Sequence, residues 1–486
     1  MEIDQLEEIA TRAMIDRDFL ATFSPAVQAE EAKITSAPVP NSPYKDMRDF
    51  LWVSIDNDDS RDLDQLTHAI EKDGVIKIFI AVADVDGLVK IDSEIDRHAA
   101  HNTTSVYTPT KVFPMLPLKL SNNLTSLNED AERSAVIVEI DVFSDNHFEP
   151  AGIYLALVKN HARLTYKWVA ALLDDDTPLP NPQGKVDGIT EQLKLQDRAA
   201  KQIRQMREDQ GNLTFNTREL TARVVPGVGI TLEEHRQLSS SRLIENFMIA
   251  ANITMSRYFR QNKLPILSRV VLQPKRWDRI MALAKTLGTV LPSEPDPKAL
   301  QMFLEKRRKA DPEKFPELSL TLIKLIGRGE YMVEIEGSVG HFDLALRQYA
   351  HTTAPNRRYP DVIVQRILKS HLTASKQPYT LEELKDLAAY CTQKEDDATK
   401  VERRVQKSAA ALVLAHRIGE EFEGIITGAS EKGTWVRLFQ PPVEGKIVKG
   451  MQGLDIGDRV TVRLVDVNVT EGFIDFATVR NTKADR

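Results

Sequence analysis

Cysteine is almost absent from this chain, whose 486 residues include a single one, Cys391. One cysteine cannot form a disulfide within the chain, and no zinc site can be built from cysteine pairs. Long apolar runs are missing too: no stretch of about 18 apolar residues occurs, so we expect no membrane-spanning helix. The first residues are acidic and polar, unlike a signal peptide. These absences favour a cytoplasmic protein that works in a reducing compartment.

An excess of basic residues is also missing, since 64 Lys and Arg face 71 Asp and Glu and the net charge is −7. A protein that coats nucleic acid is usually basic, so the charge argues against that class. It does not exclude an enzyme that confines positive charge to one channel and negative charge to a metal site. With 42% hydrophobic residues, the chain can bury two or three domain cores.

The order of sequence patterns predicts an α+β protein in three parts. Residues 1–45 read as short amphipathic helices followed by a Pro-rich linker over 36–43. Residues 46–416 mix apolar strands with long helices, which predicts a central mixed α/β domain. The clearest strands are 75–82 and 135–142, and the clearest helices are 241–261, 360–372 and 399–416.

Residues 417–486 have a different texture, with short alternating strands separated by glycine turns. The clearest strands are 423–428, 434–438 and 459–464. Several short strands within about 65 residues predict a small closed β-barrel.

The sharpest feature is an aspartate cluster that follows the apolar strand start at residues 50–53. Five aspartates occur within nine residues, and Asp62 and Asp64 are two apart, which places both carboxylates on one side of an extended chain. Asp56 is one short loop away. Crowded carboxylates are costly unless a cation lies between them, and hard divalent cations prefer oxygen ligands. Two such ions are a common device for phosphodiester displacement.

Two other interpretations of this cluster must be weighed, and one of them stays open on spacing alone. A calcium-binding EF-hand loop would need glycine at its sixth position and glutamate at its twelfth, and both are missing. A solvated acidic loop remains the simple alternative.

Two further features have an ordinary and a functional interpretation. Arg357 and Arg358 lie in a proline-bounded turn before a helix, where guanidinium groups can bind phosphate, although arginine pairs commonly bridge surface carboxylates. Tyr107 precedes Pro109 in a turn and can stack on a nucleobase, although a core tyrosine is the more frequent case.

Taken together, four blocks in order resemble the ribonuclease II family of RNB-type 3′-to-5′ exoribonucleases. The blocks are residues 56–65, residues 83–122 with their Ser-Val-Tyr-Thr-Pro segment, residues 243–252, and residues 353–359. The C-terminal residues resemble the S1-type RNA-binding OB barrel. The resemblance implies a processive, magnesium-dependent nuclease, with manganese as a possible substitute and one or two ions bound. Single-stranded RNA is the implied partner and nucleoside 5′-monophosphates the product, with no obligate protein partner indicated.

The resemblance also implies roles for individual residues. Asp56, Asp62 and Asp64 become metal ligands, with Asp64 the residue most needed for catalysis, and Arg357 stabilises the transition state. Substrate-binding roles fall to four residues: Tyr107 and Phe215 stack on the terminal base, Glu402 contacts the terminal ribose, and Arg358 tracks the RNA backbone.

One departure from the family concerns the last position of the aspartate motif. The family motif usually ends Asp-x-Asp-Asp, whereas here Gln65 follows Asp64. A glutamine can bind a cation through its carbonyl oxygen but adds no charge, and Asp58 or Asp59 is the hypothetical replacement for it. The departure supports an alternative, a catalytically weakened or inactive RNA-binding protein on the same scaffold. A DNA nuclease would share the metal chemistry, but the S1-type barrel disfavours it.

The other departure lies at the N-terminus. Family members usually carry two cold-shock barrels before the catalytic domain, whereas the residues before it here read as helices. We expect a small helix-turn-helix-like unit in their place, and better tolerance of structured RNA that carries a single-stranded 3′ overhang.

Overall fold

The computed structural model describes most of the chain. It covers residues 2–482 with gaps at 38–43, 211–212, 214, 216–219, 226–228, 235–236, 272–273, 275, 313, 335–348, 431–432 and 455–456. Most of the expected Pro-rich linker therefore lies outside the described residues.

A mixed sheet forms the centre of the expected mixed α/β domain, with the strand order β1-β8-β2-β3-β4-β7. Strand β8 has 18 residues. Its first part pairs with β7, and its last part extends beyond β7 and pairs in parallel with β2, so β8 joins β7 to β2. The strands are β1 (Lys45–Asp46), β2 (Trp52–Asp56), β3 (Gln65–Lys72), β4 (Val75–Ala83), β7 (Glu132–Val142) and β8 (Phe148–Thr165).

Both faces of this sheet are buried, which explains the near-continuous apolar runs of its strands. Side chains alternate between the faces of a strand. In β4, Ile78 and Ile80 join the main hydrophobic core, whereas Phe79 and Ala81 join a second core on the opposite side. The predicted strands 75–82 and 135–142 lie within β4 and β7.

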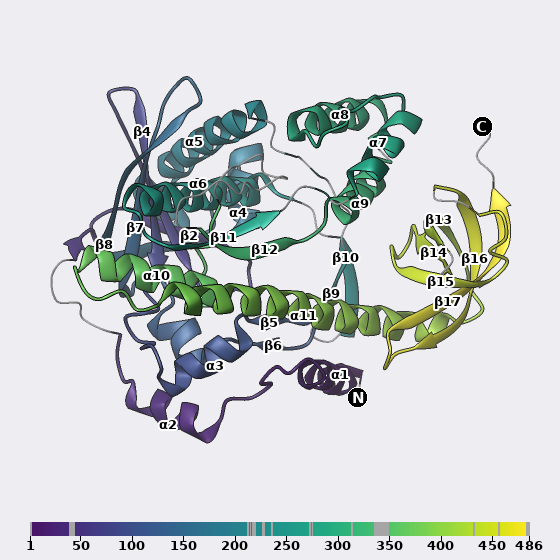
Figure 1. Ribbon diagram of the computed structural model, residues 1–486, viewed down its shortest axis with the longest axis horizontal. Helices are drawn as coiled ribbons and strands as arrows, with labels where there is room; N and C mark the ends of the chain where they lie inside the picture. The colour runs from purple at the N-terminus through teal and green to yellow at the C-terminus, as the bar shows by residue number, and fades with distance from the viewer. Residues whose placement is uncertain are drawn as a thin grey trace.

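Helices pack against the main core and continue the mixed α/β pattern (Figure 1). Helix α4 begins where β8 ends, because the Thr165 side chain caps it by accepting a hydrogen bond from the Trp168 amide at 3.2 Å. The helices of this layer are α3 (Glu94–Asn102), α4 (Tyr166–Asp175), α5 (Ile189–Asp209), α6 (Ser239–Gln261) and α10 (Tyr359–Leu372).

The longest helix, α11 (Leu381–Leu414), runs from the mixed α/β domain to the C-terminal barrel (Figure 1). A capping box starts it: Thr380 accepts from the Glu383 amide at 3.3 Å, and Glu383 accepts from the Thr380 amide at 2.7 Å. The helix expected at 399–416 is therefore the second half of a much longer one. On its way α11 contacts the hairpin of β5 (Val106–Tyr107) and β6 (Val112–Phe113).

A helical subdomain is inserted between the paired strands β11 (Ile266–Val271) and β12 (Gly329–Glu334). Its helices α7, α8 and α9 have their own hydrophobic core, which includes Trp277, Phe303 and Phe315. Their bounds, with those of the smaller elements, are α7 (Trp277–Thr286), α8 (Pro297–Ala310), α9 (Phe315–Ile326), the hairpin β9 (Leu220–Val225) and β10 (Gly229–Glu234), a π-helix (Leu120–Leu124) and 3-10 helices (Gln183–Lys185 and Ala415–Arg417).

The C-terminal residues form the expected closed five-stranded barrel, in the order β13-β14-β15-β17-β16. Its apolar interior includes Val436, Ile447, Val460 and Phe476, and Ala411 of α11 joins the same cluster. The strands are β13 (Glu421–Ser430), β14 (Gly433–Leu438), β15 (Glu444–Lys449), β16 (Arg459–Asn468) and β17 (Phe473–Thr482).

The N-terminal segment is helical as expected, but its two helices pack in different places. In α1 (Glu2–Ile15), Leu6 lies against α11 and the β9–β10 hairpin, and Ala13 and Met14 join a cluster with Val401. In α2 (Pro25–Lys33), Val27 instead joins the main core. The two helices therefore do not form the separate helix-turn-helix-like unit expected from the sequence. Throughout the described ranges, none of the helices has the length and apolar character that crossing a membrane requires.

Candidate active site

The aspartate cluster forms the connection between β2 and β3, so its position is set by two neighbouring strands. Asp56 is the last residue of β2, and Asp62 and Asp64 lie on either side of the buried Leu63. The Leu63 amide donates to Ser126 Oγ at 2.9 Å, and the Leu63 carbonyl accepts from the Leu127 amide at 3.0 Å. With Leu63 anchored in the core, both flanking carboxylates face the other way.

The three aspartates share one cavity of about 330 Å³ with Tyr107, Arg357 and Gln65. The structure therefore brings together most of the residues that the sequence singled out. The complete lining comprises Asp56, Asn57, Ser60, Asp62, Asp64, Gln65, Tyr107, Tyr166, Ile244, Met248, Thr353 and Arg357.

Two of the aspartates accept hydrogen bonds from neighbouring side chains of the cavity. Asp56 Oδ1 accepts from Gln65 Nε2 at 3.3 Å, while Asp56 Oδ2 is buried and has no partner. Asp62 Oδ2 accepts from the Tyr107 hydroxyl at 2.9 Å. Asp56 Oδ2 is therefore a buried acceptor that receives no hydrogen bond from the described residues.

The third aspartate, Asp64, is held by the arginine segment. Its Oδ1 accepts from the Asn356 backbone amide at 2.9 Å, and its Oδ2 lies 3.4 Å from Arg357 Nε. Only 3% of Asp64 is exposed, whereas 45% of the Arg357 side chain is. The guanidinium group is thus anchored at one edge and presented to the cavity.

Burial is the main reason why two of these carboxyls resist ionisation. It raises the pKa of Asp56 from 3.8 to about 7, with a further increase from the Asp62 charge. It also raises the pKa of Asp64 to about 7, although Arg357 lowers it in part. Groups of this kind require a compensating cation to be ionised together.

The donor set fits a hard divalent cation, because it consists of carboxylate oxygens around an orphaned acceptor. Asp56, Asp62 and Asp64 are the residues able to hold it. Over the described ranges, however, no three or more His, Cys, Asp and Glu side chains are already arranged as a metal-binding cluster. One oxygen of Asp62 is instead held by Tyr107.

Tyr107 is held by hydrogen bonds at its backbone amide and at its hydroxyl. Its hydroxyl donates to Asp62, and its backbone amide donates to Glu402 Oε1 of α11 at 3.0 Å. The residue is 42% exposed and lines the cavity, as a base-stacking side chain requires. Glu402 does not line the cavity. Its side chain contacts the Tyr107 backbone, and its expected contact with the terminal ribose stays a prediction.

The arginine segment places its two arginines differently, which corrects one expectation. Arg358 pairs with the buried Asp361 at 2.8 Å, and its side chain is 19% exposed and does not line the cavity. A guanidinium group held in this way supports the loop from inside, so Arg358 is not positioned to track an RNA backbone. Asp361 also accepts from the Ala354 amide at 2.7 Å, which fixes the turn before Arg357.

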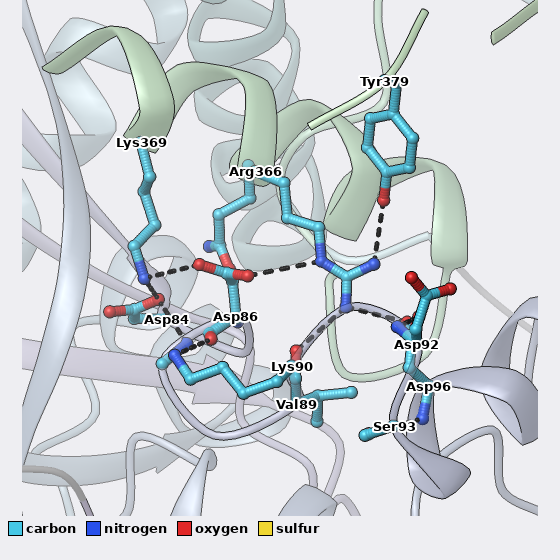
Figure 2. A network of polar contacts seen from close by, with 12 residues as sticks. Asp84, Asp86, Val89, Lys90, Asp92, Ser93, Asp96, Arg366, Lys369 and Tyr379 are labelled. Atoms are coloured by element: carbon cyan, nitrogen blue, oxygen red, sulfur yellow. Dashed lines mark hydrogen bonds and ion pairs between the residues drawn. The ribbon is translucent and has the colours of Figure 1, made fainter. Parts of the chain in front are cut away.

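The helix that follows the arginine segment, α10, is anchored by a network of buried charges (Figure 2). Arg366 is 2% exposed and lies 2.7 Å from Asp96 of α3 and 3.3 Å from Asp86. One turn later, Lys369 lies 2.7 Å from Asp84 and 2.9 Å from Asp86. This network ties α10 to the end of β4 and to α3, and so fixes the helix that starts just after Arg357.

Three further expected site residues lie outside the cavity. Phe215 packs against the core of the α7–α9 subdomain. Asp58 pairs with Lys167 at 2.7 Å, and Asp59 pairs with Arg223 at 3.0 Å. Because both aspartates are engaged in exposed ion pairs, neither replaces the charge that Gln65 lacks.

Sequence reasoning gave no role to six lining residues, namely Asn57, Ser60, Tyr166, Ile244, Met248 and Thr353. Tyr166 follows Thr165, which is paired with Asp56 across the parallel strands β8 and β2. No local sequence signal reports that pairing. Ile244 and Met248 are four apart on α6, in the helix block already singled out, so their helical spacing was an available signal.

Comparison with known families gives two matches along the chain. Residues 44–374 match the family model of the RNB domain. Residues 420–479 match the model of the RNase II-type exonuclease C-terminal S1 domain.

Curated relatives cover most of this chain. Ribonuclease R of Escherichia coli (strain K12) is 31% identical over 91% of the chain and 58% of its own length. Ribonuclease R of Aquifex aeolicus (strain VF5) is 29% identical over 97% of the chain and 70% of its own length. The chain thus spans less than two thirds of the Escherichia coli relative.

Solved structures share the fold at low identity. Mycoplasma genitalium RNase R in complex with ribose methylated single-stranded RNA aligns with a TM-score of 0.87 and 22% identity, covering 98% of this chain and 78% of that one. Yeast Ssd1, described as a pseudonuclease, aligns with a TM-score of 0.72 and 18% identity, covering 95% and 58%. The same fold therefore occurs in a nuclease and in a pseudonuclease.

Proposed function

The chain belongs to the RNB-domain family, and from that premise we propose that it is a magnesium-dependent exoribonuclease. It removes nucleotides one at a time from the 3′ end of single-stranded RNA, releases nucleoside 5′-monophosphates and acts in RNA degradation or processing. The observation that carries this proposal is the single cavity shared by Asp56, Asp62, Asp64, Tyr107 and Arg357.

The carboxylates of the cavity would hold magnesium, with manganese as a substitute. When bound, the ion supplies Lewis-acid activation of the phosphodiester and of the attacking water. Asp56 offers a buried oxygen without a partner, and Asp64 is oriented by the Asn356 amide and Arg357. Asp64 is the aspartate most tightly fixed, so we assign it the largest effect on catalysis.

Arg357 and Tyr107 would act on the substrate directly. The exposed part of the Arg357 guanidinium would stabilise negative charge that builds up on the phosphate oxygens. The Tyr107 ring would stack on the terminal base and thereby place the last phosphate beside the carboxylates. The Tyr107 hydroxyl donates to Asp62, so the ring that would stack on the base is held beside a proposed metal ligand.

RNA is the proposed substrate class because the chain ends in a closed barrel that matches the S1 domain model. Relatives named ribonuclease R, and a solved RNase R bound to single-stranded RNA, support the same choice. The cytoplasm is the proposed compartment, since the one cysteine, Cys391, is buried and free.

A 5′-labelled unstructured RNA tests the proposal. With magnesium, the wild-type protein should produce a ladder that shortens stepwise from the 3′ end. The Asp64→Asn variant and a chelator should each abolish the ladder. Asp59→Asn is the matched control, because Asp59 belongs to the same segment but lies outside the cavity, and it should degrade RNA like the wild type.

A second candidate is an RNA-binding protein with little or no catalysis. Gln65 favours it, because this lining residue adds an amide and no charge to the acidic cavity. Yeast Ssd1 supports the possibility, since it is a pseudonuclease of the same fold. If the wild type binds the RNA but leaves it intact in both magnesium and manganese, the second candidate replaces the first.

A further inference from the structure

Some of the six carboxylate oxygens in the cavity contact a protein donor and others do not. This difference affects how many cations the cavity can bind. Four of them already contact a protein donor: one on Asp56, one on Asp62 and both on Asp64. Two of the six remain without a described donor, Asp56 Oδ2, which is fully buried, and Asp62 Oδ1. Asp56 and Asp62 therefore each keep one oxygen that accepts no hydrogen bond among the described residues.

Gln65 is responsible for one of the occupied oxygens. Its side chain is the only carboxamide besides Asn57 that lines the cavity within the described residues, and Gln65 is 9% exposed at the start of β3. Its Nε2 donates to Asp56 Oδ1. This amide donor takes up a lone pair of the Asp56 oxygen that could otherwise face a cation. A carboxylate at the same place would set acceptor against acceptor and would require such a cation.

The net charge of the cavity also favours a single bound divalent ion. With a cation bound and all three carboxyls ionised, the three carboxylates and the guanidinium that line the cavity carry a net charge of −2. One divalent ion brings this to zero, whereas two leave an excess of +2 in a space of about 330 Å³. Like charges at such short separations repel strongly, and no RNA phosphate is there to offset them.

We propose that Gln65 limits the RNA-free cavity to one divalent ion, by holding one oxygen of Asp56 as a hydrogen-bond donor. This inference rests on the proposed function, because it takes the cavity as a metal site. It makes Gln65 a positioning residue that sets the number of ions, and the second ion of a two-metal reaction would have to arrive with the RNA.

Manganese binding without RNA tests the inference, with free Mn²⁺ measured by electron paramagnetic resonance during a titration. The wild type should bind one tight ion per chain. Gln65→Glu keeps the length of the side chain, replaces the donor by an acceptor and adds one charge, so it should bind two. Asp56→Asn should lose the tight site, and Asp59→Asn should keep one. Circular dichroism confirms that each variant is folded.

Two tight ions on the wild type, or one on a folded Gln65→Glu variant, would overturn the inference. The RNA ladder assay separates this failure from that of the proposed function. If the wild type binds two ions and produces a ladder, the exonuclease proposal is supported and the role of Gln65 is rejected. One bound ion with no ladder leaves the role of Gln65 standing and rejects the exonuclease.

Discussion

Replacing Arg366 by methionine should be one of the most destabilising single changes in the catalytic region. Its side chain is 2% exposed, and its guanidinium group contacts Asp96, Asp86, the Val89 carbonyl and two tyrosine hydroxyls. Asp86 would keep Lys369 at 2.9 Å, but Asp96 has no other ion pair among the described residues. The variant thus leaves the buried Asp96 carboxylate without a cation, with hydrogen bonds in the described part of the chain only from the Asp92 amide and the Tyr359 hydroxyl. Breaking a buried pair from one side costs about 3–5 kcal/mol, and we expect a loss of that size.

Urea unfolding followed by circular dichroism measures this loss in the transition of the catalytic region. Adding Asp96→Asn to Arg366→Met removes the orphaned charge, so the double variant should recover part of the stability. Arg48→Met is the matched control, because the ion pairs of Arg48 with Asp46 and Glu132 are exposed, and it should unfold like the wild type. A loss below about 1 kcal/mol for Arg366→Met, the range of exposed pairs, would refute the reasoning.

Further predictions concern the cavity and the N-terminal helix. Arg357→Ala should lower kcat by about 10²–10³-fold in single-turnover assays while the fold is kept, since one charge-stabilising donor is lost. Tyr107→Ala should weaken RNA binding by about 1–3 kcal/mol in titrations, and Tyr107→Phe much less, if stacking dominates. Asp56 and Asp64 have pKa values raised to about 7, so the thermal stability of metal-free protein should fall as pH rises from about 4 through 7, and magnesium should restore it. Leu6→Ala, at a fully buried position of α1, should cost about 2–5 kcal/mol in urea unfolding.

The fold was largely predictable where a segment carries its own signal. The apolar strand at 135–142 lies inside β7, and the helix at 360–372 differs from α10 by one residue. The barrel followed from alternating strands and glycine turns. The length of α11 was not predicted, although its first half carries two readable signals, the Thr380 capping box and the buried residues Leu384, Ala388 and Cys391 at helical spacing.

The site was predictable only as a set of residue types. The resemblance of separate blocks to the ribonuclease II family, rather than the residue types alone, indicated that the carboxylates, an arginine and a tyrosine belong to one site, and the structure gathers them in one cavity. Their individual partners were not readable. Arg357 and Arg358 are adjacent and identical in type, yet one faces the cavity and the other pairs with the buried Asp361. Likewise Tyr166 reaches the cavity through a strand pairing of residues far apart in sequence.

Helix α11 connects the Tyr107 segment with the C-terminal barrel and fixes the orientation of one relative to the other about the helix axis. Glu402 on this helix holds the Tyr107 amide, and twelve residues later Leu414 is part of the barrel core. Each residue of an α-helix turns the chain by about 100°. A single insertion or deletion between these two points would therefore swing the barrel around the helix axis relative to the cavity. This stretch of chain should tolerate substitutions on its exposed face far better than any change in its length.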